Sequence, residues 1–174
     1  MTIEGKKVLM IVAPQNFRDE ELLEPKDVLE KQGFQVIIAS KKTKQATGKL
    51  GAIVNVDIEY SQASVKDYNA IVFVGGGGAT VYFDDPIVHK MIQEASNQNK
   101  IIAGICIASS ILANAGILSN KKATCFPSEQ NNLEKKGSIY TGERVTVDGN
   151  IITANGPQSA TEFGEKIANL LKTI

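Results

Sequence analysis

The sequence predicts an α/β fold, a sandwich in which helices cover a mainly parallel sheet. Short runs of β-branched residues alternate along the chain with amphipathic stretches, which is the pattern of successive βα units. The chain has 174 residues, 43% of them hydrophobic, and these proportions are ordinary for one domain with a large core. Since no linker, internal repeat or low-complexity tract interrupts the alternation, we expect a single domain over residues 1–174.

The first half of the chain is expected to supply three buried strands and two helices. Residues 7–13 form a nearly unbroken apolar run, which is typical of a central strand covered on both faces. A helix follows over residues 19–33, with Gly33 as its stop and Pro25 near its amino end, where proline is tolerated best. The other expected elements are strands over residues 34–40 and 68–74, a peripheral antiparallel strand or hairpin over 52–58, and a helix over 85–98 opened by Pro86.

The second half continues the alternation. Residues 101–105 form a buried strand that runs directly into Cys106, and the alanine-rich apolar stretch over 107–114 predicts an interior helix. An Asp-Gly dipeptide predicts a tight hairpin within residues 144–154. We also expect a strand over residues 122–126 and a final amphipathic helix over 159–171, with Ser159 or Thr161 near its cap.

Composition limits the partners that the protein can have. The 19 Lys and Arg residues balance 19 Asp and Glu residues, so no net charge favours nucleic acid or an anionic membrane surface. No apolar run approaches the ~20 residues that cross a bilayer, and the amino terminus resembles a first strand rather than a signal peptide. Two cysteines and one histidine form neither a zinc motif nor a disulfide framework. We expect a cytoplasmic protein with no nucleic-acid or membrane partner, no metal site and no cofactor.

Chemistry-bearing residues follow three of the predicted buried strands. The acids Asp19, Glu20 and Glu21 come after the first strand, Gly75–Gly78 after the third buried strand and Cys106 after the fourth. Because ligand sites of open α/β sheets form outside the carboxyl ends of the strands, we expect these three groups to share one edge of the sheet.

Cys106 stands between a predicted strand and a predicted helix, with the small residues Gly104 and Ala108 on either side. This is the strand–turn–helix arrangement of a nucleophile elbow. A helix amino terminus favours the reactive thiolate, although by only ~0.3 to 1 kcal/mol, which is under one pKa unit. The alternative is that Cys106 is a small buried hydrophobic residue.

The glycine run and the acids each have two interpretations. Gly75–Gly78 could bring backbone N–H groups close to an oxyanion, or could be a flexible turn, and it matches no phosphate-binding motif. The three acids are by default first-turn residues that complement the helix dipole. One of them could instead point inward, where apolar surroundings would keep it protonated and able to donate a hydrogen bond to a thiolate or an oxidised sulfur.

His89 and Cys125 are expected to be structural. His89 lies in the middle of a predicted helix, far from the strand ends that carry the other candidates. Cys125 lies at the end of a neighbouring predicted strand, and we favour a structural role over that of a resolving partner for Cys106.

Five segments in order resemble the ThiJ/PfpI superfamily: KKVLMIVA, the acids ahead of Pro25, IVFVGGGG, IIAGICIAS and RVTVDGNIITANGPQSATEF. The similarity runs from about Lys6 to Leu171 and points to the branch that contains the Parkinson's-linked protein deglycase and YajL. The resemblance implies a flavodoxin-like three-layer sandwich, usually a homodimer, with a nucleophile elbow at Cys106.

The resemblance also implies roles for individual residues. Glu21, four residues ahead of the proline, would contact Cys106, while Gly75, Gly76 and Ile107 would supply backbone N–H groups to the pocket. Two positions depart from the family. Ile107 stands where family members described as proteases or amidases have a histidine, and Phe126 precedes Pro127 where the deglycase branch often has one. We therefore expect no Cys-His dyad within one chain and doubt protease or amidase activity.

Three functions are compatible with these residues. The first is a cofactor-independent, glyoxalase- or deglycase-like enzyme that uses Cys106 and Glu21 on small α-oxoaldehydes or their protein adducts, with slow turnover because the histidine is absent. The second is a redox-responsive protective protein in which an oxidant converts Cys106 to a sulfinate stabilised by protonated Glu21. The third is a binding domain with an inert cysteine.

Overall fold

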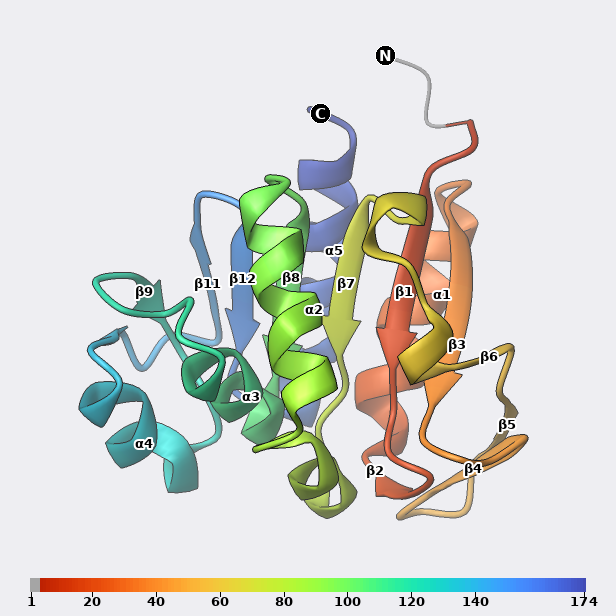
Figure 1. The fold of residues 1–174 in the computed structure, drawn as a ribbon, viewed down its shortest axis with the longest axis horizontal. Helices are drawn as coiled ribbons and strands as arrows, with labels where there is room; N and C mark the ends of the chain where they lie inside the picture. The colour runs from red at the N-terminus through yellow and green to blue at the C-terminus, as the bar shows by residue number, and fades with distance from the viewer. Residues whose placement is uncertain (1–3) are drawn as a thin grey trace.

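Residues 4–174 are described by a computed structural model, and their strands and helices follow the expected βα alternation (Figure 1). The strands are β1 (Lys7–Ile11), β2 (Gln15–Phe17), β3 (Gln35–Ser40), β4 (Gln45–Gly48), β5 (Ile53–Asn55), β6 (Ile58–Glu59), β7 (Ala70–Phe73), β8 (Ile101–Ile105), β9 (Lys122–Ala123), β10 (Ile139–Tyr140), β11 (Val145–Asp148) and β12 (Ile151–Ala154). The α-helices are α1 (Asp19–Lys31), α2 (Pro86–Asn97), α3 (Ser109–Asn114), α4 (Gln130–Lys135) and α5 (Ala160–Leu171). Over this described part of the chain, no helix has the length and apolar character needed to cross a bilayer.

A seven-stranded sheet forms the middle layer of a three-layer sandwich. Its strand order is β11-β12-β8-β7-β1-β3-β6, and every pair is parallel except β11 with β12. Helices α2 and α3 lie in front of the sheet in Figure 1, and α1 and α5 lie behind it. The expected flavodoxin-like sandwich with a mainly parallel sheet is therefore confirmed.

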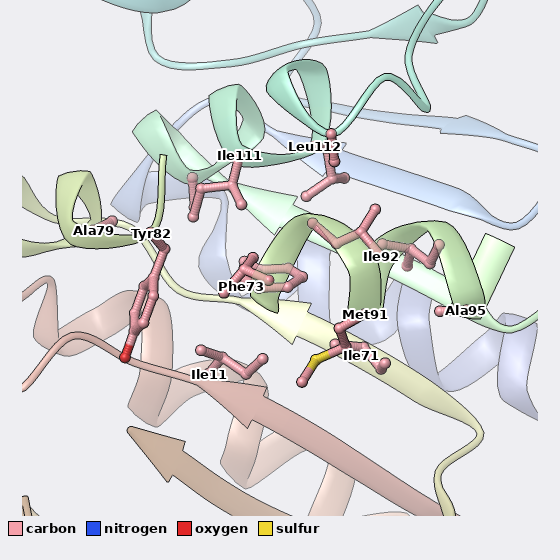
Figure 2. Packing of buried hydrophobic residues seen from close by; sticks show 14 of the residues in the cluster. Ile11, Ile71, Phe73, Ala79, Tyr82, Met91, Ile92, Ala95, Ile111 and Leu112 are labelled. Carbon is pink, nitrogen blue, oxygen red and sulfur yellow. The ribbon is translucent and has the colours of Figure 1, made fainter. Parts of the chain in front are cut away.

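The core lies on both faces of the sheet, which explains the unbroken apolar strands of the sequence. Along β7, Ile71 and Phe73 pack under α2 and α3, while Ala70 and Val72 pack on the side of α1 and α5. Figure 2 shows the first of these layers, where Phe73 lies close to Ile92 of α2. Because both faces of this mainly parallel sheet are covered by helices, successive side chains of a central strand, which point to opposite faces, must all be apolar.

The strand expected over residues 122–126 is mostly wrong. Only Lys122–Ala123 is a strand, paired with β10 in a small separate sheet. The next backbone N–H groups bond elsewhere: that of Thr124 donates to the Thr153 hydroxyl at 2.9 Å, and that of Phe126 donates to the Cys106 carbonyl at 3.2 Å. After Ala123 the segment therefore no longer pairs with β10, and its hydrogen bond to the Cys106 carbonyl links it to the turn there.

Two further expectations need correction. Pro25 lies inside α1 rather than near its amino end, and it packs so closely against α5 that a Cβ at Gly164 would lie 2.8 Å from the Pro25 Cα. Tertiary packing there outweighs the loss of one helical hydrogen bond. The segment over 52–58 is divided: β5 pairs antiparallel with β4 as expected, but β6 joins the main sheet parallel to β3.

Candidate active site

Cys106 occupies a sharp turn at the carboxyl end of β8. Its φ angle is +63°, in the left-handed region that residues other than glycine rarely adopt. A 3₁₀ turn over Cys106–Ala108 leads directly into α3, and the chain folds back so tightly that a Cβ at Gly104 would lie 3.1 Å from a Leu112 methyl carbon. This backbone is the nucleophile elbow, in which local strain presents one side chain at the edge of the sheet.

The three acids at the start of α1 have three different environments. The Asp19 carboxylate accepts hydrogen bonds from the backbone N–H groups of Leu50 and Ala52, both at 2.8 Å. Glu20 forms an ion pair with Arg18 at 2.8 Å. Glu21 is fully buried and turns toward the elbow. Only one of the three carboxyl groups is therefore available to act beside Cys106.

Glu21 is a buried acid without a good hydrogen bond. Within residues 4–174, neither of its carboxyl oxygens has a partner of full hydrogen-bond geometry. Burial raises the pKa of Glu21 to about 7, although the Cys106 thiol and the Gly75 backbone N–H lie close enough to lower it in part. Near neutral pH the carboxyl group can therefore both hold and release a proton.

Cys106 is 8% exposed, and the pKa of its thiol is raised to about 12, chiefly by burial and then by the adjacent Glu21 carboxylate. The backbone N–H groups of Ile107 and Gly76 lower this pKa, but by less. The backbone N–H groups at the start of the helix therefore favour the thiolate as expected, but burial and the Glu21 charge disfavour it more strongly. Protonation of Glu21 removes the negative charge beside the sulfur, so ionisation of one group depends on the state of the other.

Three of the four glycines of Gly75–Gly78 are explained by close packing. A Cβ at Gly75 would collide with Glu21 and lie 2.7 Å from the Cys106 Cβ. Gly76 has a φ of +94° and a Cβ there would collide with the Arg18 backbone nitrogen, while a Cβ at Gly78 would collide with the Gln15 carbonyl. A Cβ at Gly77 would meet nothing within 4 Å. At this edge of the sheet the Gly75–Gly78 backbone packs directly against neighbouring segments of the chain, so it is not a flexible turn.

A cavity of about 230 Å³ lies at the sulfur. Its lining comes from both halves of the chain: Arg18, Glu21, Lys49, Gly76, Gly77, Cys106, Ile107, Phe126 and Pro157. The structure thus gathers Cys106, Glu21, Gly76 and Ile107 around one space, while the Gly75 N–H points to Glu21.

A second hollow of about 690 Å³ shares Lys49 and Gly77 with this cavity. Arg18, Lys49 and Pro157 also line the cavity and were not predicted as site residues. Lys49 carries no motif, and the only signal for Pro157 was its place in the NGPQS stretch of the family resemblance.

His89 and Cys125 lie outside this cavity. His89 lies on α2, where its Nε2 lies 2.7 Å from the Phe83 carbonyl oxygen. Cys125 is fully buried in the core layer under α2 and α3, whereas Cys106 belongs to the layer on the other side of the sheet, and both are free thiols. Over residues 4–174, no three His, Cys, Asp or Glu side chains come together to form a metal-binding cluster.

The fold and the elbow define a class of α/β proteins that present a cysteine, with a buried carboxyl group beside it, at the edge of a parallel sheet. Residues 6–170 match the DJ-1/PfpI family, and the chain belongs to this family. A solved ThiJ/PfpI domain protein from Brachyspira murdochii superposes with a TM-score of 0.95 at 34% identity, over 98% of this chain and 99% of its own.

Other relatives span nearly the whole chain. An uncharacterised protein of Methanocaldococcus jannaschii is 39% identical over 98% of this chain and 84% of its own length. A protein of Pyrococcus horikoshii named as a deglycase is 30% identical, over 95% of this chain and 99% of its own. A Caenorhabditis elegans protein named as a glutathione-independent glyoxalase is 25% identical, over 96% and 89%. Drosophila melanogaster DJ-1beta is 31% identical over 96% and 90% of the two chains, and its crystal structure superposes with a TM-score of 0.89.

Proposed function

We propose that the protein is a glyoxalase- or deglycase-like enzyme in which Cys106 attacks small α-oxoaldehydes or their adducts on proteins. The observation that carries the proposal is the Glu21 carboxyl group, fully buried beside the Cys106 thiol with a pKa raised to about 7. The names of the Pyrococcus and Caenorhabditis relatives support the same chemistry. The similarity to DJ-1beta supports placement in the branch of the Parkinson's-linked deglycase.

The chemistry follows from the groups around the cavity. The Cys106 thiolate adds to the aldehyde carbon of the substrate, and the resulting oxyanion accepts hydrogen bonds from the backbone N–H groups of Gly76 and Ile107. Glu21 then takes the proton from the former aldehyde carbon and returns it to the neighbouring carbon, which leaves a thioester of a 2-hydroxy acid. Water hydrolyses the thioester and restores the thiol. The sum is an α-oxoaldehyde plus water giving a 2-hydroxy acid, with no external oxidant or reductant.

Turnover should be slow. Among residues 4–174, no histidine lines the cavity, and Phe126, which is 42% exposed, is part of the lining. A positioned imidazole typically raises the reaction rate ~100-fold or more. Because one carboxyl group here serves as both acid and base, we expect turnover to be slower by about that factor than with a histidine in the site.

The test is production of lactate from methylglyoxal by the purified full chain. We expect Cys106→Ala to abolish it and Glu21→Gln to reduce it by at least ~100-fold, because Gln cannot transfer the proton. Cys125→Ala is the matched control, since that thiol lies in the other core layer. Equal lactate production by the wild type and Cys106→Ala would rule the proposal out.

We propose a redox role as the second candidate, because the same acid can donate a hydrogen bond to an oxidised sulfur. Peroxide would convert the thiolate to a sulfenate and a second peroxide would convert that to the sulfinate, each releasing one water. Protonated Glu21 and the N–H groups of Gly76 and Ile107 are the donors available to the sulfinate oxygens.

Mass spectrometry after peroxide treatment should then show two added oxygens on Cys106 and none on Cys125. Glu21→Gln, which keeps a donor, should still form the product, whereas Glu21→Leu should not. Equal oxidation of the two cysteines would remove this candidate.

The homodimer implied by the family resemblance is part of the same proposal. Light scattering from the purified protein should give about twice the chain mass of 18.7 kDa. A mass of one chain at micromolar concentration would contradict it.

A further inference from the structure

Lys49 is the unneutralised charge at the cavity. Of the two cations in the lining, Arg18 is held by Glu20 through two contacts, at 2.8 and 3.1 Å. The Lys49 ammonium has no acidic group within 4.0 Å and no hydrogen-bond partner among residues 4–174. Beyond the Arg18–Glu20 pair, the lining therefore carries the positive charge of Lys49 and, once the Cys106–Glu21 pair has lost a proton, one negative charge at the sulfur.

The turn that carries Lys49 is fixed to the helix that carries Glu21. The Lys49 backbone N–H donates to the Phe17 carbonyl at 2.8 Å, and the Gly48 N–H donates to the Ala52 carbonyl at 2.7 Å. Asp19 accepts from two further N–H groups of the same turn. Because Asp19 is two residues from Glu21, the position of the Lys49 backbone relative to the acid is set by these bonds.

Lys49 also lies where the two hollows meet. The 230 Å³ cavity at Cys106 and the adjoining 690 Å³ hollow share only Lys49 and Gly77 in their linings. Gly77 carries no side chain, and the space beside its Cα is open. A substrate with its carbonyl at the sulfur can therefore extend past Gly77 into the larger hollow, and its tail passes Lys49.

We propose that Lys49 selects α-oxoaldehydes whose tail carries a carboxylate. The proposal deepens the function proposed above and uses the same reaction steps, with Lys49 contacting only the tail. The Lys49 ammonium forms no ion pair among residues 4–174 and can pair with one carboxylate, whereas Arg18 is already paired with Glu20. Uncharged methylglyoxal would then be a poor substrate relative to a carboxylate-bearing homologue.

The first test does not depend on turnover. The rates of Cys106 alkylation by iodoacetate and by iodoacetamide are measured on the full chain at low ionic strength. The modified residue is located by mass spectrometry, and the two rates are normalised to those of 2-mercaptoethanol, a thiol with no other charged group. The ratio cancels any change in thiol reactivity. We expect the wild type to prefer iodoacetate about three- to tenfold over the free thiol, because the unit charge of the exposed Lys49 side chain exerts that much attraction and is screened by salt.

Lys49→Gln should bring this ratio to that of the free thiol, and Lys49→Glu should bring it below. Lys66→Gln is the matched control, because Lys66 is exposed and precedes β7 at the opposite edge of the sheet. An unchanged ratio in Lys49→Gln, or loss of the preference in Lys66→Gln, would overturn the inference.

The second test compares kcat/KM for 4,5-dioxopentanoate and uncharged 2-oxopentanal. Lys49→Gln should lower the ratio of the two values about three- to tenfold, chiefly through KM for the anion. If Cys106 of the wild type prefers iodoacetate but the protein turns over neither compound, the anion selectivity stands and the proposed enzyme function is wrong. A wild type that turns over both compounds equally would remove the selectivity alone.

Discussion

The carboxyl group of Glu21 occupies the space that a side chain at residue 75 would need. A Cβ built on Gly75 would collide with Glu21 and lie 2.7 Å from both the Cys106 Cβ and the Ile105 carbonyl oxygen. The glycine, the acid and the cysteine come from three distant parts of the chain and pack as one unit. Close packing within this unit holds the acid beside the sulfur.

Gly75→Ala should therefore damage the site and the fold together. We expect a loss of about 1–3 kcal/mol in the free energy of unfolding, because the added methyl group has no room to relax. Denaturant unfolding measures it. Gly77→Ala is the control, since a Cβ there meets nothing within 4 Å, and it should change stability by less than about 0.5 kcal/mol. Equal effects of the two substitutions would contradict this packing.

Glu21 should make the protein less stable as the pH rises. Its pKa is raised from 4.5 to about 7, so between these values the folded state binds more protons than the unfolded state. The free energy of unfolding then falls as pH rises through this window, by about 3 kcal/mol in total. Glu21→Gln has no ionisable group there, so its stability relative to the wild type should increase by up to that amount between pH 4.5 and 8. Denaturant unfolding at several pH values measures it, with the surface variant Glu30→Gln as control.

The pH profile of Cys106 alkylation should reveal the coupling between the two groups. The pair loses its first proton near pH 7, and the remaining negative charge lies mainly on the Glu21 carboxylate, with a small fraction on the Cys106 sulfur. We expect the wild-type iodoacetamide rate to rise through pH 7 and then level off. In Glu21→Leu the step disappears, and the rate should rise about tenfold per pH unit between pH 6 and 8, as for a lone buried thiol. Identical profiles would show that the groups do not interact.

Asp19→Ala should release the turn that carries Lys49. The substitution leaves the N–H groups of Leu50 and Ala52 without their acceptor, which should lower the free energy of unfolding by about 1–3 kcal/mol. The iodoacetate preference of Cys106 should fall with it, because Lys49 is no longer held near the cavity. Asp27→Ala removes an exposed acid of the same helix that pairs with Lys31, and should cost at most about 0.5 kcal/mol with no change in the alkylation ratio.

Much of the architecture was predictable because buried parallel strands must be apolar on both faces. The runs that contain β1, β7 and β8 stand out for this reason, and the hairpin of β11 and β12 follows from its Asp-Gly turn. The predictions were wrong where contacts with residues distant in the sequence determine the local structure. Residues 124–126 have strand composition, yet their N–H groups bond to Thr153 and Cys106. Pro25 lies inside a helix because α5 packs against it.

The candidate site was predictable in outline but not in its electrostatics. The cysteine, the glycines and the three acids were predicted as site residues because each group follows a predicted buried strand. Only the family resemblance distinguished Glu21 from the other two acids. Sequence position could not separate Asp19, Glu20 and Glu21, since all three begin the same helix. Their partners, the turn at Leu50, the Arg18 side chain and the elbow, separate them in space.

The sequence by itself determined the α/β fold and the tight turn at Cys106, because apolar periodicity and small flanking residues are local properties. The tertiary structure alone decided which acid meets the sulfur, that burial raises both pKa values, and that Lys49 lines the cavity. The physical reason is that desolvation and charge depend on every neighbour within a few ångströms, and those neighbours come from segments far apart in the chain.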